Sequence, residues 1–472
     1  MRITAFFLIA MVMLVSISAC QRIVAHSVIP TTVPTAIVPP ASPVATILPT
    51  HPPEVPLGFS IPLTGSAQVC LLTEIPLIRE MLWSLETFAW SPTEDALVYV
   101  GPDREEDTPL TGTLMMMRFA PHIDTPQVLA PNVVGNPTWS PDGSRIAFVA
   151  LRPNDQVGTI MVIDADGSNL LDLLPGDKAR TDPGAGYKAI EGWWDKDQIV
   201  VSTNCGAGCR RPMLLDLRRQ TLEPLLSSGQ EGSSYAWSPD RASVMVASGA
   251  NPQIGAISQN EEEVSWFSGH GSLDTSLASF WTFFVDWSPD SSHLLFLRLP
   301  NDRSGPPELW VWNRDTRAMS ALLTSVITAR WSPQGDQIAF LAQGQPHLAS
   351  DGSFADVTPD PEDSNALVVG LYQYFEGGVV TLFKVSTVDV GINFIEELTR
   401  SPVLVWSPNG GQLVYFDEVG YARFLSINEF SQDEIPTRGY PPDDVSWSSD
   451  GKKLAVQTSG YVQVFAVPCS PQ

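Results

Sequence analysis

One short pattern, a tryptophan followed by a turn and an apolar run, returns along most of the chain. Its clearest copy is Trp139-Ser140-Pro141-Asp142-Gly143, with Ile146-Ala147-Phe148-Val149 directly behind it. Proline favours the first central position of a type I turn, and glycine permits the left-handed backbone that returns the chain antiparallel. Each copy therefore predicts a β-hairpin. The copies, of which the one at position 194 lacks Ser-Pro, are centred on Trp90, Trp139, Trp194, Trp237, Trp287, Trp331, Trp406 and Trp447.

A second hairpin completes the unit around Trp139. Residues 159–163 and 170–174 are strand-like and are separated by the turn Asp164-Ala165-Asp166-Gly167. This turn resembles a calcium loop only in part, because the closing glutamate is missing, so we interpret it as a hairpin turn. The apolar runs do not alternate with polar residues, which predicts that both of their faces are covered. Four-stranded units repeated in this way indicate small sheets stacked in a closed ring, which is a β-propeller.

The predicted fold is therefore all-β. Residues 66–472 are expected to form a single β-propeller of four-stranded blades, with eight blades as the first interpretation and seven as the alternative. The longest spacing, between Trp331 and Trp406, indicates one blade with an insertion at about 342–378, which is either a surface loop or a binding loop. The Trp-Ser-Pro-Asp-Gly units resemble the repeats of TolB-like (WD-type) propellers. This resemblance implies a fold and not an activity, because such propellers serve as binding modules, scaffolds and gates to enzyme domains.

The first residues of the chain predict export. Residues 1–19 look like a lipoprotein signal peptide, because a positive start and an apolar run lead to Ile17-Ser18-Ala19-Cys20, which resembles a bacterial lipobox. A retained anchor helix is the alternative. Cys20 is the predicted lipid-attachment residue, and the rest of the protein is expected outside the cytoplasm, held by lipid to the bacterial cell membrane or outer membrane. Residues 20–65 are rich in proline and threonine, which predicts a disordered, extended tether.

The other four cysteines are disulfide candidates, because export favours oxidation. Cys205 and Cys209 are close in sequence and are expected to form a small staple, with an incomplete zinc site as the alternative. The last tryptophan unit holds only three strand-like runs, and the run 67–72 can supply the fourth. That pairing would bring Cys70 and Cys469 together, so we expect a disulfide between them, with two buried free thiols as the alternative.

Charge and motifs exclude several classes of function. The chain has 52 acidic and 27 basic residues, giving a formal net charge of −25, which disfavours nucleic-acid binding. Neither a Gly-x-Ser-x-Gly nor a His-Glu-x-x-His motif is present, so no catalytic residue, cofactor or metal is assigned. We expect a non-catalytic scaffolding or binding module for envelope proteins or peptides, with glycans as a further ligand class. The alternative is an enzyme that acts on glycans or peptides through carboxylates of the propeller channel.

The two sides of the predicted ring should differ. The two short turns of each unit point to one side, so the longer and more variable loops that join the hairpins point to the other. Variable loops on a rigid scaffold tend to carry recognition, although unconstrained drift of the loops is the alternative. The residues assigned to this joining-loop side are Arg104, Arg152, Asp155, Arg210, Asp302 and Arg303.

Overall fold

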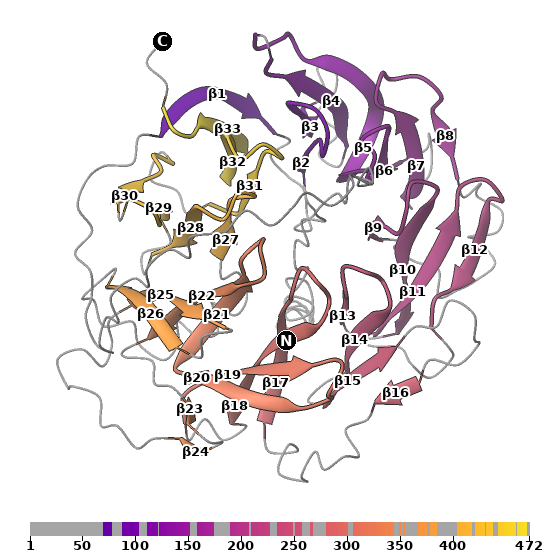
Figure 1. The fold of residues 1–472 in the computed structure, drawn as a ribbon. Coiled ribbons are helices and arrows are strands. Elements are labelled where there is room, and N and C mark those ends of the chain that lie inside the picture. Colours follow the sequence, from indigo (N-terminus) through magenta and orange to yellow (C-terminus); the bar gives the residue numbers. More distant parts are fainter. Residues whose placement is uncertain are drawn as a thin grey trace, which may run out of the picture.

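The described part of the chain consists of β-strands arranged in a ring (Figure 1). The strands form antiparallel sheets, six of four strands, one of seven and one of two. No helix capable of crossing a membrane occurs among these residues. The computed structural model describes residues 69–77, 87–102, 111–120, 122–151, 158–173, 189–206, 209–226, 234–248, 251–256, 265–267, 280–300, 305–343, 349–350, 353–354, 367–374, 378–384, 404–417, 421–429, 431–437, 442–458 and 460–469.

Strands that follow one another in the chain are neighbours in nearly every sheet. The strands are β1 (Cys70–Pro76), β2 (Phe88–Trp90), β3 (Ala96–Gly101), β4 (Gly112–Arg118), β5 (Gln127–Trp139), β6 (Arg145–Ala150), β7 (Thr159–Asp164), β8 (Leu171–Asp172), β9 (Ala189–Trp193), β10 (Gln198–Gly206), β11 (Cys209–Asp216), β12 (Thr221–Pro224), β13 (Ser234–Trp237), β14 (Ser243–Ser248), β15 (Asn251–Ala256), β16 (Ser265–Phe267), β17 (Phe280–Trp287), β18 (His293–Pro300), β19 (Glu308–Asn313), β20 (Met319–Thr324), β21 (Val326–Trp331), β22 (Gln337–Gln343), β23 (Ala349–Ser350), β24 (Ser353–Phe354), β25 (Leu367–Gln373), β26 (Gly378–Lys384), β27 (Leu404–Trp406), β28 (Gln412–Phe416), β29 (Ala422–Ser426), β30 (Ser431–Glu434), β31 (Asp444–Trp447), β32 (Lys453–Thr458) and β33 (Tyr461–Ala466).

The seven-stranded sheet contains two four-stranded groups that share strand β5. The first half of β5 pairs with β4, where Gln127 lies opposite Met116, and the second half pairs with β6, where Trp139 lies opposite Ile146. Between the halves the register shifts, and Asn132 and Gly135 have positive φ values of 58° and 150°. Such irregularities bend a strand and allow it to serve two sheets in turn.

The serine–proline turns are fixed by one repeated hydrogen-bond pattern. In the turn after β5, Ser140 Oγ accepts from Arg145 N at 2.9 Å and donates to Asp142 Oδ1 at 2.7 Å, while Gly143 N donates to Ser140 O at 2.8 Å. Gly143 has a φ of 69°, as the sequence predicts for the residue that reverses the chain. The Asp164–Gly167 stretch is likewise a hairpin turn, because Gly167 N donates to Asp164 O at 2.8 Å.

Five repeat tryptophans link their innermost strand to the innermost strand of the preceding sheet. The carbonyl that accepts the indole N–H always belongs to the residue just before the preceding repeat tryptophan. An inner edge strand leaves such carbonyls without a ladder partner, and the indole satisfies them. The bonds from Nε1 are Trp90 to Ser446 O (3.1 Å), Trp139 to Ala89 O (3.2 Å), Trp193 to Thr138 O (3.1 Å), Trp287 to Ala236 O (3.1 Å) and Trp406 to Arg330 O (3.2 Å).

In the third unit this place belongs to Trp193 and not to Trp194. Trp193 ends β9, is 2% exposed and makes the indole bond to Thr138 O. Trp194 is only partly buried and lies edge-on to Trp237, with ring centroids 5.6 Å apart. The assignment of Trp194 to the repeat is therefore off by one residue, because the turn before Ile199 is shorter than in the other units.

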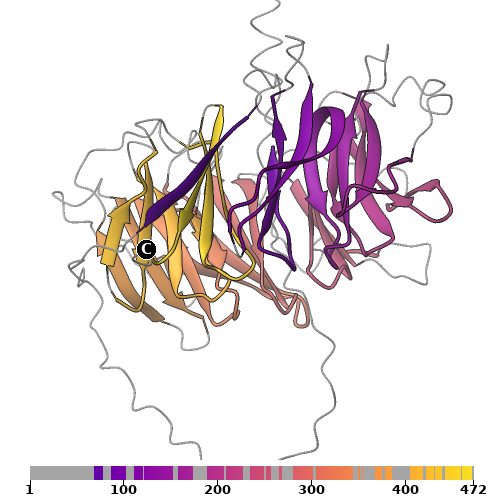
Figure 2. The ribbon, with the colours of Figure 1, turned by 90° about the horizontal axis from the view of Figure 1, so that it is seen from above.

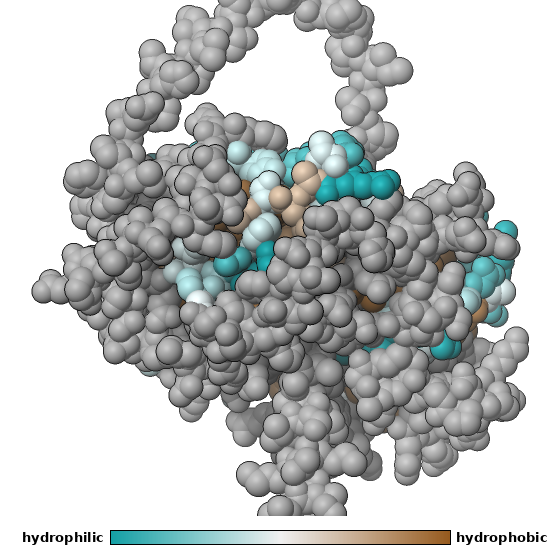
Figure 3. Space-filling model, turned by 90° about the horizontal axis from the view of Figure 1, so that it is seen from below, coloured by the Kyte–Doolittle hydropathy of each residue, from teal (hydrophilic) through white to brown (hydrophobic). Residues whose placement is uncertain are grey.

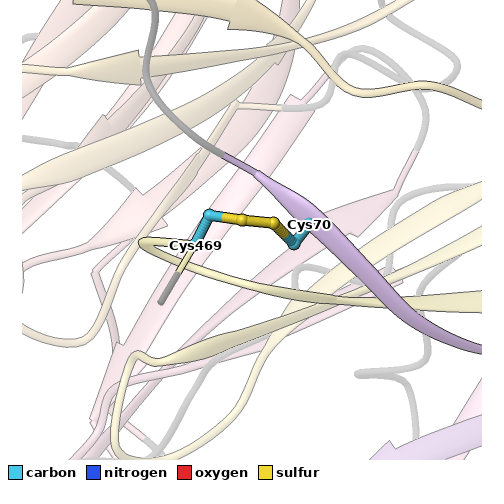
Figure 4. The surroundings of a disulfide bond; sticks show 2 residues. All are labelled: Cys70 and Cys469. Carbon is cyan, nitrogen blue, oxygen red and sulfur yellow. A yellow bond between two sulfur atoms is a disulfide. The ribbon is translucent and has the colours of Figure 1, made fainter. Parts of the chain in front are cut away.

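The ring is closed by strands from the two ends of the described chain, as expected. Strand β1 pairs antiparallel with β33, from Cys70 opposite Ala466 to Pro76 opposite Tyr461, and Figure 2 shows the indigo β1 against the yellow C-terminal strands. The strand begins at residue 70, slightly later than the predicted run 67–72. A disulfide joins Cys70 to Cys469, whose Cα atoms are 5.2 Å apart (Figure 4).

The inserted segment is shorter than the sequence suggests. Strand β25 pairs with β22, from Gln337 opposite Gln373 to Gln343 opposite Leu367, and β26 continues the same sheet. The range 342–378 predicted to be an insertion therefore includes residues 367–373 of β25, which form the third strand of the sheet. The small hairpin of β23 and β24 lies in the segment between β22 and β25.

The hydrophobic core is divided among the interfaces between neighbouring sheets. Val414 and Phe424 of one sheet pack with Trp447 and Leu454 of the next, and each is less than a tenth exposed. This explains why the apolar runs do not alternate, because each strand is covered by a sheet on both faces.

The indole bond should be measurable by comparing two tryptophans of similar burial. Trp139 is 8% exposed and Trp447 is 6% exposed, but within the described residues the Nε1 of Trp447 has no hydrogen-bond acceptor. Trp139→Phe leaves the carbonyl of Ala89 unsatisfied, so we expect it to cost about 1–3 kcal/mol more than Trp447→Phe in urea unfolding. Equal losses for the two variants would show that the indole bond contributes no stability.

Candidate functional site

The turn side of the ring is tied together by contacts between successive sheets. A Cβ on Gly451 would touch Pro408 at 3.5 Å, and one on Gly335 would touch Pro289 at the same distance. Arg314 Nη1 also reaches Asp240 Oδ2 of the preceding sheet at 2.6 Å. These turns are therefore packed against one another around the ring.

Of the residues predicted to mark the joining-loop side, Arg210 lies in the described part of the chain. It is the second residue of β11, its side chain is 30% exposed, and its Nη1 lies 3.3 Å from Glu191 Oε1. The carbonyl of Arg210 accepts from Tyr235 Oη at 2.6 Å, so its backbone is fixed to the next sheet. The other predicted residues, Arg104, Arg152, Asp155, Asp302 and Arg303, lie outside the described residues.

The other predicted sites fall mostly on chain that is not described. Cys20, the signal peptide and the tether all lie before residue 69. Cys205 and Cys209 belong to the adjoining ends of β10 and β11, but their side chains are not among those described. Their disulfide stays a prediction.

A cluster that sequence reasoning missed lies at the joining-loop end of β18 and β19. Arg298 lies opposite Glu308 in the strand register, and each residue is 8% exposed. The guanidinium carbon of Arg298 sits 4.4 Å from the centroid of the Trp310 ring, and Trp310 Nε1 donates to Glu308 Oε2 at 2.7 Å. The sequence signal for it was a single arginine closing the apolar run 294–297.

Burial controls the ionisation of this Arg298–Glu308–Trp310 cluster. Burial raises the pKa of Glu308, against the opposing effects of the Trp310 hydrogen bond and the Arg298 charge. Burial also lowers the pKa of Arg298. A buried pair of this kind is poorly hydrated and fixed in place. It therefore fixes the partly buried Trp310 ring close to the joining-loop end of β18 and β19.

A second polar feature lies at the inner edge of the ring, where β17 adjoins β21. Asp286 and Arg330 are the residues just before repeat tryptophans 287 and 331, and both are partly buried. Asp286 Oδ2 accepts from the backbone N–H of Trp331 at 2.9 Å, and Arg330 Nη1 donates to Val285 O at 3.0 Å. The Trp331 indole N–H has no acceptor within the described residues, so these bonds stand in for the indole bond.

The Asp286 carboxyl titrates close to neutral pH. Removal from water raises its pKa to about 6, although the Arg330 charge and the backbone N–H groups of Trp331 and Trp287 lower it. A buried carboxyl with such a pKa is a candidate functional group. The charged group that lowers its pKa is Arg330, so among the described residues the electrostatics of Asp286 show an ion pair and not a pair of carboxylates.

Neither feature is a metal centre. The described residues contain no group of three or more histidine, cysteine, aspartate or glutamate side chains able to hold a metal ion. On the side of the molecule seen in Figure 3, hydrophilic and hydrophobic described residues are interspersed.

Comparison with solved structures identifies the fold. The C-terminal WD40 domain of Sif2 aligns with a TM-score of 0.51 and 13% identity, covering 86% of this chain and 100% of that one. The Dos1 propeller aligns with a TM-score of 0.51 and 10% identity, covering 84% and 95%. The described chain is a β-propeller. An oligogalacturonate lyase in complex with manganese scores 0.44 at 13% identity, covering 84% and 98%, which is too low to support an argument.

These likenesses show the fold alone, because the sequence identities are low. No protein-family model matches the sequence, and no curated protein matches it. The β-propeller fold is thus supported by structure, whereas the TolB-like (WD-type) resemblance rests on the sequence motif.

Asp286 gives a pH-dependent prediction. Because its pKa is raised in the folded protein, the ionised carboxylate weakens folding above about pH 6, and this penalty disappears as the pH falls towards its unfolded pKa of about 4. Asp286→Asn stays neutral and keeps an oxygen for Trp331 N. We expect it to raise the free energy of unfolding by at most about 3 kcal/mol at pH 8.

At pH 4 the free energy of unfolding of Asp286→Asn should equal that of the unchanged protein. The difference between the two free energies should grow between pH 4 and pH 6. Urea unfolding at several pH values measures it. The interface between two neighbouring sheets is called a seam below. If Asp286→Asn is destabilised at pH 8, the ionised carboxylate stabilises the seam between the sheets of β17 and β21 through its contacts with Arg330 and Trp331.

Proposed function

We propose that this chain is an exported bacterial lipoprotein whose propeller binds an envelope protein or peptide on its joining-loop side. Cys20 would carry the lipid, residues 20–65 would form the tether, and the ring would serve as a rigid, non-catalytic binding module. The observation that carries the proposal is the difference between the two sides of the ring. One side is packed together through short turns, and the other has longer joining segments.

Eight blades are part of this proposal. If β5 is counted once in each of its two groups, then β2–β5 and β5–β8 are two blades. The six four-stranded sheets supply the others. The alternative of seven blades would require treating the seven-stranded sheet as a single blade, although its two halves pair with different strands.

The residue types on the joining-loop side favour a protein or peptide as the partner. Arginine and tryptophan are enriched where proteins bind one another tightly. Arg210, Arg298 and Trp310 all lie at joining-loop ends of strands, in a protein whose net charge is −25. The Arg210 side chain is 30% exposed, and a positive group on an otherwise acidic protein suits a partner segment that carries carboxylates. Glycans are the other ligand class to be tested.

Two arginines at opposite ends of β11 allow a matched binding test. Arg210 lies at the joining-loop end of β11, whereas Arg218 follows its other end on the turn side and is 71% exposed. After crosslinking in cells, we expect Arg210→Glu to reduce recovery of the partner about tenfold and Arg218→Glu to leave it unchanged, because only the first charge faces the partner. The opposite pattern would place binding on the turn side.

Anchoring is tested separately at the proposed lipid site. Cys20→Ser removes the thiol that would be acylated, so we expect the protein to leave the membrane fraction or to remain unprocessed. Fractionation with mass spectrometry of the N-terminus measures both. An intact Met1, or cleavage elsewhere without lipid, would contradict the proposed anchor.

A further inference from the structure

The chain enters the ring at an outer sheet edge. Strand β1 is the outermost strand of the sheet ordered β1-β33-β32-β31, and Cys70 is its first residue. Cys70 is also the first residue of β1 to pair, opposite Ala466. The disulfide to Cys469 therefore lies where the N-terminal segment joins the propeller (Figure 4).

Without this disulfide, tension from the N-terminal side would act on one backbone pair at a time. The Cys70–Ala466 pair would open first, and the ladder would then separate towards Pro76. The start of β1 is weakly buried, since Leu71 is 49% exposed, and its firmest apolar contact, Ile75 at 1% exposure, comes near its end. An edge strand pulled from this end can therefore separate from β33 pair by pair.

We propose that the Cys70–Cys469 disulfide carries the tension of the tether past β1 and into β33. Strand β33 has β1 on one side and β32 on the other, and its Val462, Val464 and Phe465 are fully buried. The residue after it, Val467, donates its N–H to Lys452 O at 2.8 Å. This inference rests on the proposed anchoring at Cys20, because tension arises only if the N-terminal segment is held.

The ring is also held closed by contacts that do not involve β1. Trp90 Nε1 donates to Ser446 O on β31, and Thr87 Oγ1 donates to Gln457 Oε1 on β32 at 2.6 Å. Lys453 Nζ lies 2.6 Å from Asp95 Oδ2 across the same seam. Loss of the disulfide should therefore free β1 under tension while the rest of the ring stays closed. An effect confined to β1 distinguishes the proposed transfer of tension from a general stabilisation of the propeller by the disulfide.

The experiment is force spectroscopy on the full chain, with one handle inserted among residues 21–65, where removal of residues 1–19 does not affect it, and the second in the exposed turn at Asp315–Thr316. Three samples are compared: the unchanged protein, the same protein with reductant added after folding, and Cys70→Ser/Cys469→Ser. We expect the last two to show an early low-force step of about 25 Å, the extended length of the seven residues of β1. The oxidised protein should lack this step.

Two controls make the result specific. Cys205→Ser/Cys209→Ser removes the other cysteine pair and should behave like the unchanged protein. With handles in the turns at Asp166 and Asp315, reductant should produce no early step, because the tension then bypasses β1.

An early step in the oxidised protein would overturn the proposal. So would the lack of an early step in both the reduced protein and the double variant. The reduced sample keeps the test decisive if the double variant fails to fold. The handle replaces the membrane as the source of tension, so this result is independent of whether Cys20 carries lipid.

Discussion

The hydrogen bond from the indole of five repeat tryptophans to a carbonyl of the previous sheet sets the geometry of much of the described ring. An innermost strand has a ladder partner on only one side, so its inner carbonyls need another donor. The indole supplies it and also fills the apolar interface between the sheets, as Trp139 does by bonding to Ala89 O within a cluster that includes Phe148. One residue thus fixes both the polar and the apolar side of a seam. This dual role explains why tryptophan is the most regular feature of the repeat.

The seams without this bond show what can replace it. At the seam between the sheets of β9 and β13, Arg241 Nη2 donates to the carbonyl oxygen of Trp193 at 3.0 Å. Arg241 has a left-handed backbone with a φ of 61°, at the turn position that glycine occupies after Trp139. Before Trp331, Asp286 and Arg330 bridge the seam. Charged side chains bridge both seams, and at the seam of Trp331 they take over from a neutral indole that has no acceptor among the described residues. A charged group of this kind makes the stability of a seam depend on pH only if its pKa is near neutrality, and the pKa of Asp286 is about 6.

The sequence predicts the fold well because the repeat encodes local turns and strands. The Ser140-Pro141-Asp142-Gly143 turn and the clasp of β1 on β33 follow from turn chemistry and from the count of strands per unit. The one-residue error at Trp194 arises because two adjacent tryptophans satisfy the same pattern, and only burial separates them. The overlong insertion at 342–378 has a similar origin. The apolar residues 367–373 predict a strand whether they belong to an insertion or to the blade. Only their pairing with β22 shows that they belong to the sheet of the blade.

The candidate site was harder to predict because its residues are unremarkable in sequence. Arg298 ends an apolar run and Glu308 begins another, and ten residues separate them. Their contact depends on the register of β18 against β19, which places them opposite each other and beside Trp310. Asp286 and Arg330 meet across a seam between two units, so no motif within either unit contains both. Repetition therefore reveals the scaffold, whereas these charged groups depart from the repeat and are brought together only by the register and packing of the strands.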